Sequence, residues 1–346
     1  MVKIGITVNL DSLETPYNNG LYQNIIILYE LLNKIPGLII YFITNHNVQK
    51  YKPFQITNKL LEMDFIIIMG YFLSKSNSDL CIKNGIKLIY YQLGNDYITD
   101  IHQILNQSSQ NRAFEEIQKH DEHWISPHFE YSIDYYKYIS GNNNVEVAPF
   151  FWKPNLLTPL TKEFDHTNIN IGVFEPNLNH GKNCFIPVII CEKVKTEINK
   201  AYICNSVHLY DNVKNFREFA NCSSLFKENR LTFEGRHKFQ YVMDNYCNIV
   251  VSYVENVDLN YLFLECFYLG VPLIHNSKML KDYGFYYEGC NVEMAAKHIV
   301  NIKKNGFNRE EYIEKHKVLL YKYSIENPAT IYFFKTKFLL EVTRLQ

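Results

Sequence analysis

Short apolar runs alternate with longer amphipathic stretches along most of the chain. The runs are rich in β-branched and aromatic residues and are bounded by Gly, Asn or Pro, which is typical of strands. Between them, in 21–34 for example, apolar residues recur at the i, i+3, i+4, i+7 spacing of an amphipathic helix. The pattern predicts strands over Val2–Val8, Leu38–Ile43, Phe65–Met69, Ile86–Gln92, His123–Ser126, Val145–Ala148, Ile169–Phe174, Ala201–Cys204, Leu231–Phe233, Ile249–Tyr253, Pro272–His275 and Phe285–Tyr287.

Alternation of continuously apolar strands with helices predicts an α/β protein with parallel sheets covered on both faces. Three prolines fall within residues 148–165, a composition that disfavours both helices and central strands, so we interpret this segment as an interdomain linker. The length of 346 residues also favours two domains. We therefore predict two Rossmann-like domains, 1–150 and 166–325, that face each other across a cleft, followed by a long amphipathic helix over 328–345. Open α/β sheets bind ligands beyond the carboxyl ends of their strands.

Charge and composition exclude some classes of function. The 35 basic and 36 acidic residues give a net charge of −1, which argues against a protein that coats nucleic acid or an anionic membrane. It leaves open a DNA-modifying enzyme with a local basic groove. No apolar run reaches the roughly 18 residues of a membrane span, and the first ten residues have the pattern of a strand rather than of a signal peptide.

Two compositional features bear on the cellular setting. The eight cysteines are scattered, without a CxxC pair, which predicts reduced and mostly buried thiols in the cytoplasm. The chain has 38 Asn against 7 Ala, a bias expected of an AT-rich genome such as that of some large DNA viruses or parasites. We therefore expect a cytoplasmic protein, in the host cytoplasm if the source is viral.

The most informative segment is 233–276. A polar turn follows the predicted strand 249–253 and precedes a helix for which Asp258 is the predicted N-cap. On this helix, Asp258, Tyr261 and Glu265 lie within about 60° of each other, opposite an apolar stripe. A helix N-terminus suits a phosphate, and a carboxylate two turns further along can bind a pair of ribose hydroxyls. The alternative is a capped surface helix with a solvated Glu.

Glu265 and the sequence CFYLGVPLIHN that follows it resemble the carboxyl-terminal signature of GT-B-fold glycosyltransferases, in particular family-4-like enzymes. Upstream, Phe233-x-Gly235, Val251-Ser252 and the stretch from FEPN to Lys182-Asn183 resemble their donor domain in the same order. The phrases TPYNNGLYQN, SPHFEYSIDYYKYI, FEPNLNHGKN and YLGVPLIHNS are also similar to an uncharacterised bacterial and viral group of glycosyltransferase-like proteins.

The resemblance implies roles for several residues of the second domain. Glu265 would hold the nucleotide ribose, and Lys182 would neutralise the diphosphate with help from the backbone amides around Asn260 and Tyr261. Ser252 would lie at the strand end that borders the nucleotide sugar. Arg236 is our substitute for the partner Arg of the family, with an exposed surface Arg as the alternative.

One position departs from the family pattern. The first Glu of the motif should lie eight residues before Glu265, where this chain has Val257. Glu255 and Asp258 flank that position and are the candidates to replace the missing carboxylate in catalysis. The departure leaves a retaining or inverting outcome open.

The first domain would bind the acceptor, and its candidate contacts follow predicted strands. Asn18, Asn19 and Gly20 lie between the first strand and the first helix, where Gly permits close approach of a ligand and Asn can bind sugar hydroxyls. The alternative is a simple turn. The remaining candidates are Gln92, Asn95 and His128. Metal binding by the nearby histidines is disfavoured because they span different predicted elements. Neither a P-loop nor a GxSxG motif occurs.

The resemblance thus implies a glycosyltransferase that moves a sugar from a nucleotide sugar, with UDP or GDP as the carrier, to a glycan or another hydroxyl acceptor. We expect no metal and no other cofactor. Its partners would be the two substrates, and a homodimer stays open. Two other functions remain: a non-catalytic nucleotide- or sugar-binding protein with the same fold, and a nucleotide-sugar epimerase.

Overall fold

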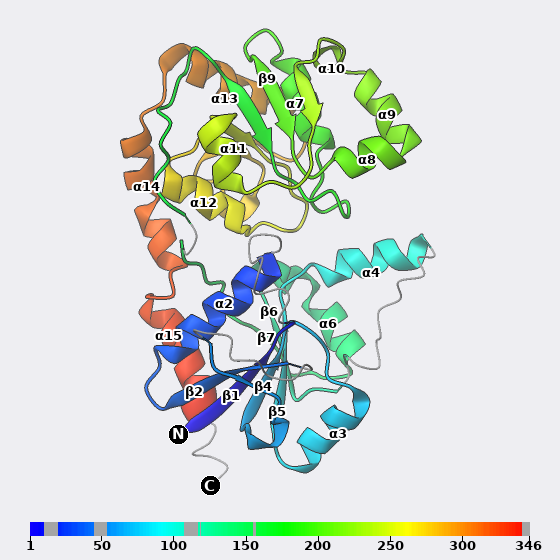
Figure 1. Ribbon diagram of the computed structural model, residues 1–346, viewed down its shortest axis with the longest axis vertical. Coiled ribbons are helices and arrows are strands. Elements are labelled where there is room, and N and C mark those ends of the chain that lie inside the picture. Colours follow the sequence, from blue (N-terminus) through cyan, green and yellow to red (C-terminus); the bar gives the residue numbers. More distant parts are fainter. Residues whose placement is uncertain (10–19, 45–53, 107–116, 118, 155–156, 341–346) are drawn as a thin grey trace. The chain divides into compact units, whose positions relative to one another are not determined.

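The computed structural model describes residues 1–9, 20–44, 54–106, 117, 119–154 and 157–340. The chain divides into two compact units, one formed by residues 1–153 and 321–346 and the other by residues 154–320 (Figure 1). Each unit is built around its own parallel sheet. The fold is therefore α/β with two Rossmann-like halves, as the alternating pattern predicts. None of the described helices combines the length and the apolar character needed to span a bilayer.

The first unit contains a sheet of order β3-β2-β1-β4-β5-β6-β7, in which every neighbouring pair is parallel. Its central strands are mostly apolar, and Phe65–Ile68 is buried along its whole length. Helix α15 (Pro328–Lys335) packs here, because the Trp124 ring lies 5.8 Å from that of Phe334. The elements are β1 (Val2–Thr7), α2 (Gly20–Asn33), β2 (Leu38–Ile43), β3 (Ile56–Thr57), η2 (Leu60–Glu62), β4 (Phe65–Ile68), α3 (Lys75–Lys83), β5 (Lys87–Gln92), α4 (Asp96–Leu105), β6 (Glu122–Ile125), η3 (Pro127–Ser132), α6 (Ile133–Ser140), β7 (Val145–Val147), α15 (Pro328–Lys335) and the π-helical turn η5 (Thr336–Leu340).

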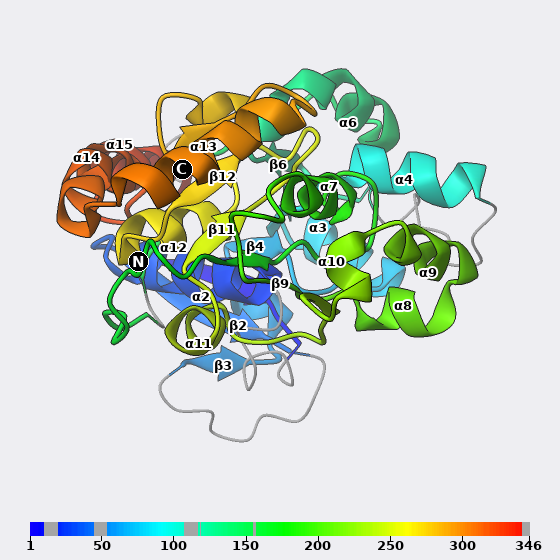
Figure 2. The same cartoon turned by 90° about the horizontal axis from the view of Figure 1, so that it is seen from above.

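The second unit contains a parallel sheet of order β10-β9-β8-β11-β12-β13. Helices cover both faces, with α7 and α13 on one face and α11 and α12 on the other (Figure 2). The elements are β8 (Asn170–Val173), α7 (Phe185–Lys193), β9 (Lys200–Ile203), α8 (Val207–Asn212), α9 (Lys214–Asn221), α10 (Ser224–Lys227), β10 (Leu231–Phe233), α11 (Phe239–Asn245), β11 (Ile249–Val251), α12 (Tyr261–Leu269), β12 (Leu273–His275), η4 (Lys278–Leu280), β13 (Phe285–Tyr286), α13 (Val292–Asn305) and α14 (Arg309–Lys322), whose last residues pass into the first unit.

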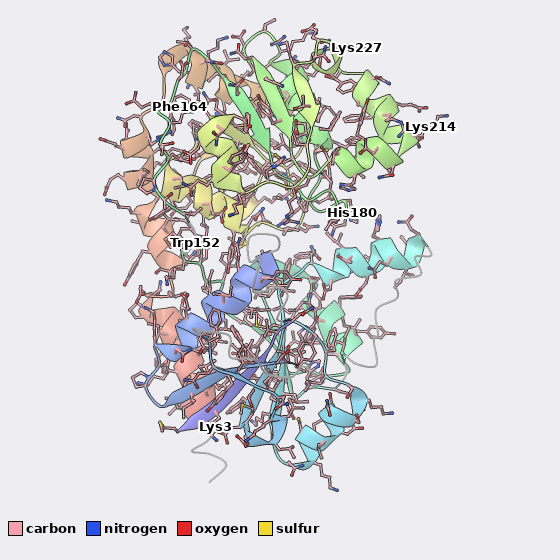
Figure 3. The ribbon with its side chains drawn as sticks, viewed as in Figure 1. Lys3, Trp152, Phe164, His180, Lys214 and Lys227 are labelled. Carbon is pink, nitrogen blue, oxygen red and sulfur yellow. The ribbon has the colours of Figure 1, made fainter. Side chains whose placement is uncertain are left out.

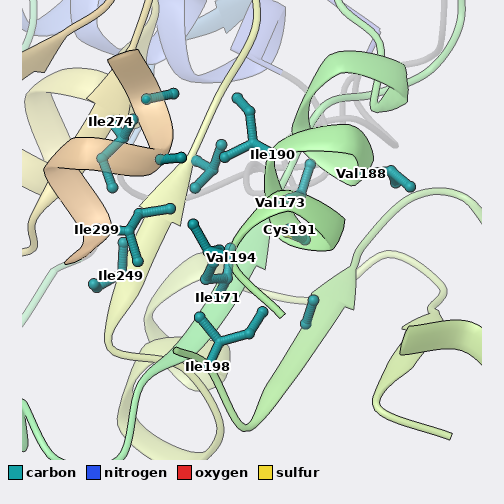
Figure 4. Packing of buried hydrophobic residues seen from close by; sticks show 14 of the residues in the cluster. Ile171, Val173, Val188, Ile190, Cys191, Val194, Ile198, Ile249, Ile274 and Ile299 are labelled. Atoms are coloured by element: carbon teal, nitrogen blue, oxygen red, sulfur yellow. The ribbon is translucent and has the colours of Figure 1, made fainter. Parts of the chain in front are cut away.

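The core of the second unit lies between the sheet and the α7–α13 pair. Figure 4 shows Ile171 and Val173 of β8 packed with Ile190 of α7, with Val194 just after α7, and with Ile299 of α13. These side chains are between 0% and 2% exposed. Burying a side chain of this size contributes roughly 1.5–3 kcal/mol. The sheet is therefore a rigid base on which the loops at its carboxyl edge are placed.

All twelve predicted strands are present, with ends within two residues of the predicted ones. The pattern missed β3, a two-residue strand at the sheet edge. The predicted helix over 328–345 is α15 followed by the π-helical turn, and its last residues lie outside the described part. All eight cysteines are free and six are buried, so the prediction of unpaired thiols is confirmed.

Candidate nucleotide site

The chain reverses its direction across the second sheet between β8 and β11. The connection from β8 leads to β9 on one side, whereas β11 pairs with β8 on the other side and leads away to β12. Loops that leave two such strands diverge, and the space between them is the usual ligand site of an open parallel sheet. We call the loop 174–183, the loop 252–260 and helix α12 the β8–β11 site. His180 marks the first of these loops in Figure 3.

Backbone contacts hold the two loops together. Lys182 forms an antiparallel bridge with Val254, and the N–H of Glu255 donates to the carbonyl of Gly181 at 2.8 Å. A Cβ atom at Gly181 would lie 3.3 Å from both the Glu255 carbonyl oxygen and Val257 Cγ2, which is a tight contact. Gly181 therefore allows the close approach that brings Lys182 beside the end of β11.

The loop after β8 is fixed by Asn177, which has a left-handed φ of 56°. Its amide nitrogen donates to the carbonyls of Glu175 (2.8 Å) and Asn205 (3.1 Å), and its amide oxygen accepts from the N–H of Cys184 (2.8 Å). Asn205, after β9, also has a positive φ, of 55°. Non-glycine residues in this region cost about 1–3 kcal/mol and gather where function requires a particular backbone course.

Glu175 is part of this loop, two residues after the end of β8, and is fully buried. Ser252 Oγ donates to its Oε1, whereas Oε2 has no hydrogen-bond partner in the described part of the chain. Burial raises the pKa of the Glu175 carboxyl to about 7, against the opposing effects of Ser252 and of the positive charge of Lys182. We did not predict Glu175 as a site residue. The available signal was an acidic side chain just after a buried strand.

Lys182, predicted to bind the diphosphate, is half-buried. Burial lowers the pKa of its ammonium group, and the negative charge of Glu175 opposes that shift. Among the described residues, its side chain has neither a hydrogen bond nor an ion pair. A desolvated cation without a protein partner at this edge of the sheet is suited to an anionic ligand.

Helix α12 begins at Tyr261 and is capped by Asn260, whose side-chain oxygen accepts from the N–H of Leu262 at 3.3 Å. The predicted cap at Asp258 is therefore wrong. Asp258 lies two residues further from the helix, and its Oδ1 accepts instead from the N–H of Lys278 at 2.5 Å. Its carbonyl accepts from Ser277 Oγ at 2.8 Å, so Asp258 ties this loop to the turn after β12.

Glu265 lies on the second turn of α12. Of the residues predicted on the polar face of this helix, Tyr261 is buried and Glu265 is half-buried. The polar face is therefore less exposed than predicted. Desolvation raises the pKa of the Glu265 carboxyl to about 7. No described residue donates a hydrogen bond to it or pairs with it. Helix α12 thus holds a half-buried carboxylate that has no hydrogen-bond partner among the described residues.

The remaining predicted residues of this unit occupy different environments. Val257, where the first Glu of the resembled motif was expected, is buried at 8% exposure. Glu255 is exposed and Ser252 is buried against Glu175. Arg236 follows β10 and is exposed, although partial burial lowers the pKa of its guanidinium.

The predicted acceptor residues lie in the first unit. Gln92, at the end of β5, is buried and its Oε1 lies 2.9 Å from His123 Nε2. Asn95 caps α4 and donates to the hydroxyl of Tyr131 at 2.9 Å. His128 is buried, with its ring centroid 3.9 Å from that of Phe129.

Of the other first-unit candidates, Gly20 is the first residue of α2, and no atom of the described residues lies within 4 Å of where its Cβ would be. Asn18 and Asn19 lie outside the described residues. A search of the described residues for metal sites finds no group of three or more His, Cys, Asp or Glu side chains placed to hold an ion.

Comparison with known proteins places this fold. No curated protein matches the chain. Among solved structures, it is similar to a sucrose-phosphate synthase from Thermosynechococcus elongatus (TM-score 0.61, 13% identity, all of both chains covered). It is also similar to HepE from Anabaena in complex with UDP-glucose (0.62, 12% identity, 99% and 100% covered). A glycosyltransferase from Rickettsia africae is a third (0.56, 11% identity, 100% and 99% covered).

These likenesses show the GT-B fold of glycosyltransferases, as the motifs predict. A family model described as a protein of unknown function, DUF2827, matches residues 4–338. That span is nearly the whole chain. The protein therefore belongs to the DUF2827 family.

Proposed function

We propose that the protein is a glycosyltransferase that uses a nucleotide sugar. The observation that carries this proposal is Glu265, a desolvated carboxylate with no hydrogen-bond or ion-pair partner among the described residues, on the helix that follows β11 of a Rossmann-like sheet. Leaving such a group unpaired costs stability, so its presence favours a ligand with hydroxyl groups. The similarity to HepE, which was solved with UDP-glucose, supports a nucleotide sugar as that ligand.

In this proposal, different residues of the β8–β11 site contact different parts of the nucleotide sugar. Glu265 accepts hydrogen bonds from the ribose, and Lys182 pairs with the diphosphate. The first amides of α12, beyond Asn260, add the positive end of the helix dipole. Because Asp258 is engaged with the backbone of Lys278, we assign contact with the donor sugar to the exposed Glu255.

The reaction would be driven mainly by stabilisation of the leaving group. When the bond between sugar and diphosphate breaks, negative charge grows on the diphosphate, and Lys182 stabilises that charge at a position fixed by Gly181. Arg236 would assist from the end of β10. No metal is required in this scheme. UDP is preferred over GDP as the carrier, and Gln92, Asn95 and His128 of the first unit would contact the acceptor.

The test is turnover of UDP-sugars and GDP-sugars, beginning with UDP-glucose, in the presence of excess chelator. Transfer to an added glycan, or slow hydrolysis with release of the nucleotide, supports a transferase. An isomerised sugar nucleotide would indicate an epimerase instead. If no nucleotide sugar binds or reacts, the proposal is overturned.

A second candidate is a non-catalytic nucleotide-binding protein. The specific observation in its favour is Val257, a buried apolar residue where the resembled enzymes have a carboxylate. Binding of UDP-glucose at the strength expected of a donor, without transfer, hydrolysis or isomerisation, would identify this function.

A further inference from the structure

Glu175 has an environment that the proposed binding of a diphosphate does not explain. Its carboxylate is completely buried at the end of β8, and one oxygen is bonded to Ser252 while the other has no partner among the described residues. Lys182, the positive charge that acts on this carboxylate, is itself desolvated, and no ion pair joins the two. The two groups therefore influence each other electrostatically without a direct ion pair.

The groups around Glu175 come from three segments of the second unit. Lys182 lies in the loop after β8, and the thiol of Cys184 follows in the same loop, at the start of α7; burial raises the pKa of that thiol to about 12, so it stays neutral. Ser252 and the backbone N–H of Tyr253, after β11, stabilise the carboxylate. Tyr287, after β13, is buried and donates its hydroxyl to the Ser252 carbonyl at 2.8 Å. Among the described groups that act on Glu175, Lys182 is therefore the charged one.

The charge balance conflicts with an anionic ligand while Glu175 is ionised. An ionised Glu175 and a charged Lys182 sum to zero, whereas a diphosphate needs a net positive site. When Glu175 is protonated, its negative charge no longer offsets the positive charge of Lys182. The site then has a net positive charge, and no buried anion repels the diphosphate. We propose that binding of a nucleoside diphosphate at the β8–β11 site is coupled to uptake of one proton from solvent by Glu175, which is thereby a positioning residue for Lys182.

This inference rests on the proposed function, since it needs a diphosphate beside Lys182. The direction of the coupling follows from linkage. A ligand that binds the protonated form more tightly binds less well as pH rises through the pKa of that group in the free protein. With that pKa at about 7, affinity should be unaffected by Glu175 at pH 6 and reduced about tenfold at pH 8.

The experiment is calorimetric titration with UDP, and with GDP in parallel, at pH 6 and pH 8. At pH 8 it is repeated in Tris and in HEPES, whose heats of ionisation differ, so that proton uptake is read directly. The phosphates of UDP are ionised at pH 8, because their second ionisation lies near pH 6. We measure no higher than pH 8, since loss of the Lys182 proton would also weaken binding.

The variants are Glu175→Gln, which keeps the shape, and Glu228→Gln as a control on the surface of the same unit, where Glu228 pairs with Arg230. Wild type and the control should take up about one proton per UDP at pH 8. Glu175→Gln should take up none and should bind UDP about as tightly as wild type at pH 6 but about tenfold more tightly at pH 8. A merely structural role would weaken binding at both values.

Ser252→Ala provides a second variant in case Glu175→Gln folds poorly. It removes the hydrogen bond that stabilises the ionised carboxylate, so the pH at which affinity falls should move upward. If wild type binds UDP or GDP without proton uptake, or if Glu175→Gln takes up as much as wild type, the coupling is wrong and the proposed function stands. If wild type binds neither nucleotide, both are wrong.

Discussion

Glu265→Gln tests whether the Glu265 carboxylate lowers the stability of the protein and strengthens the binding of UDP. The pKa of this carboxyl rises from 4.5 to about 7 on folding. When the group is fully ionised, this shift lowers the free energy of unfolding by about 3 kcal/mol. Because the folded pKa is raised, the cost is absent below pH 4.5 and complete above pH 7. Partial exposure of the side chain reduces the value to about 1–3 kcal/mol.

The neutral, isosteric amide should therefore stabilise the unit that contains α12 at pH 8 and leave it unchanged at pH 4.5. For a unit of this size, each kcal/mol raises Tm by about 2–4 °C. The same change should weaken binding of UDP about tenfold or more, because it removes a charge-assisted hydrogen bond worth about 1.5–3 kcal/mol.

The assay is chemical denaturation at both pH values together with calorimetric binding. A tighter or unchanged affinity for UDP would refute the assignment of Glu265 to the ribose. A loss of stability at pH 8 would refute the view that the carboxylate is unsatisfied. Glu293→Gln is a suitable control, since Glu293 is exposed on α13 and pairs with Lys193 at the surface.

Three further predictions concern the same unit. Lys182→Ala should lower kcat for release of the nucleotide about hundredfold while raising the Kd for UDP much less, because the charge it meets grows in the transition state; an equal effect on both would contradict this. Calorimetric affinity for UDP should survive excess chelator, and its complete loss would exclude a metal-free mechanism. The buried His275 and His316 have pKa values lowered to about 4, so their contribution to stability is lost as pH falls from 6.5 to 4. In wild type, the raised pKa values of Glu175 and Glu265 increase the stability as pH falls and so mask the effect of the two histidines. Denaturation of the variant with both Glu→Gln changes should therefore show a fall in stability from pH 6.5 to pH 4.

The sequence predicted the fold well because burial imposes a periodicity that can be read without a structure. A parallel strand covered on both faces is mostly apolar, as Phe65–Ile68 is throughout, and all twelve predicted strands are present. The strand β3 escaped because two residues carry no period. Strand ends moved by one or two residues, since hydrogen bonding in the ladder stops before the apolar run does.

A site residue could be predicted only where its position follows from the spacing within its own helix or strand. Glu265 could be placed from helical spacing, and the structure shows it at the predicted turn of α12. The cap was assigned to Asp258 instead of Asn260 because both residue types cap helices, and only the contact with Lys278 decides between them. Local sequence does not record how long a loop remains outside the helix.

Glu175 shows where prediction from sequence ends. Its properties depend on Ser252, 77 residues later in the chain, and on Lys182, which Gly181 brings beside the end of β11. None of these residues is unusual by itself. Their combination, a sealed carboxylate beside a desolvated cation, arises because two strands that are neighbours in the sheet are far apart in sequence. The net charge of the β8–β11 site is therefore set by which strands are neighbours in the sheet. Variants of Glu175 change that charge and test its effect on binding.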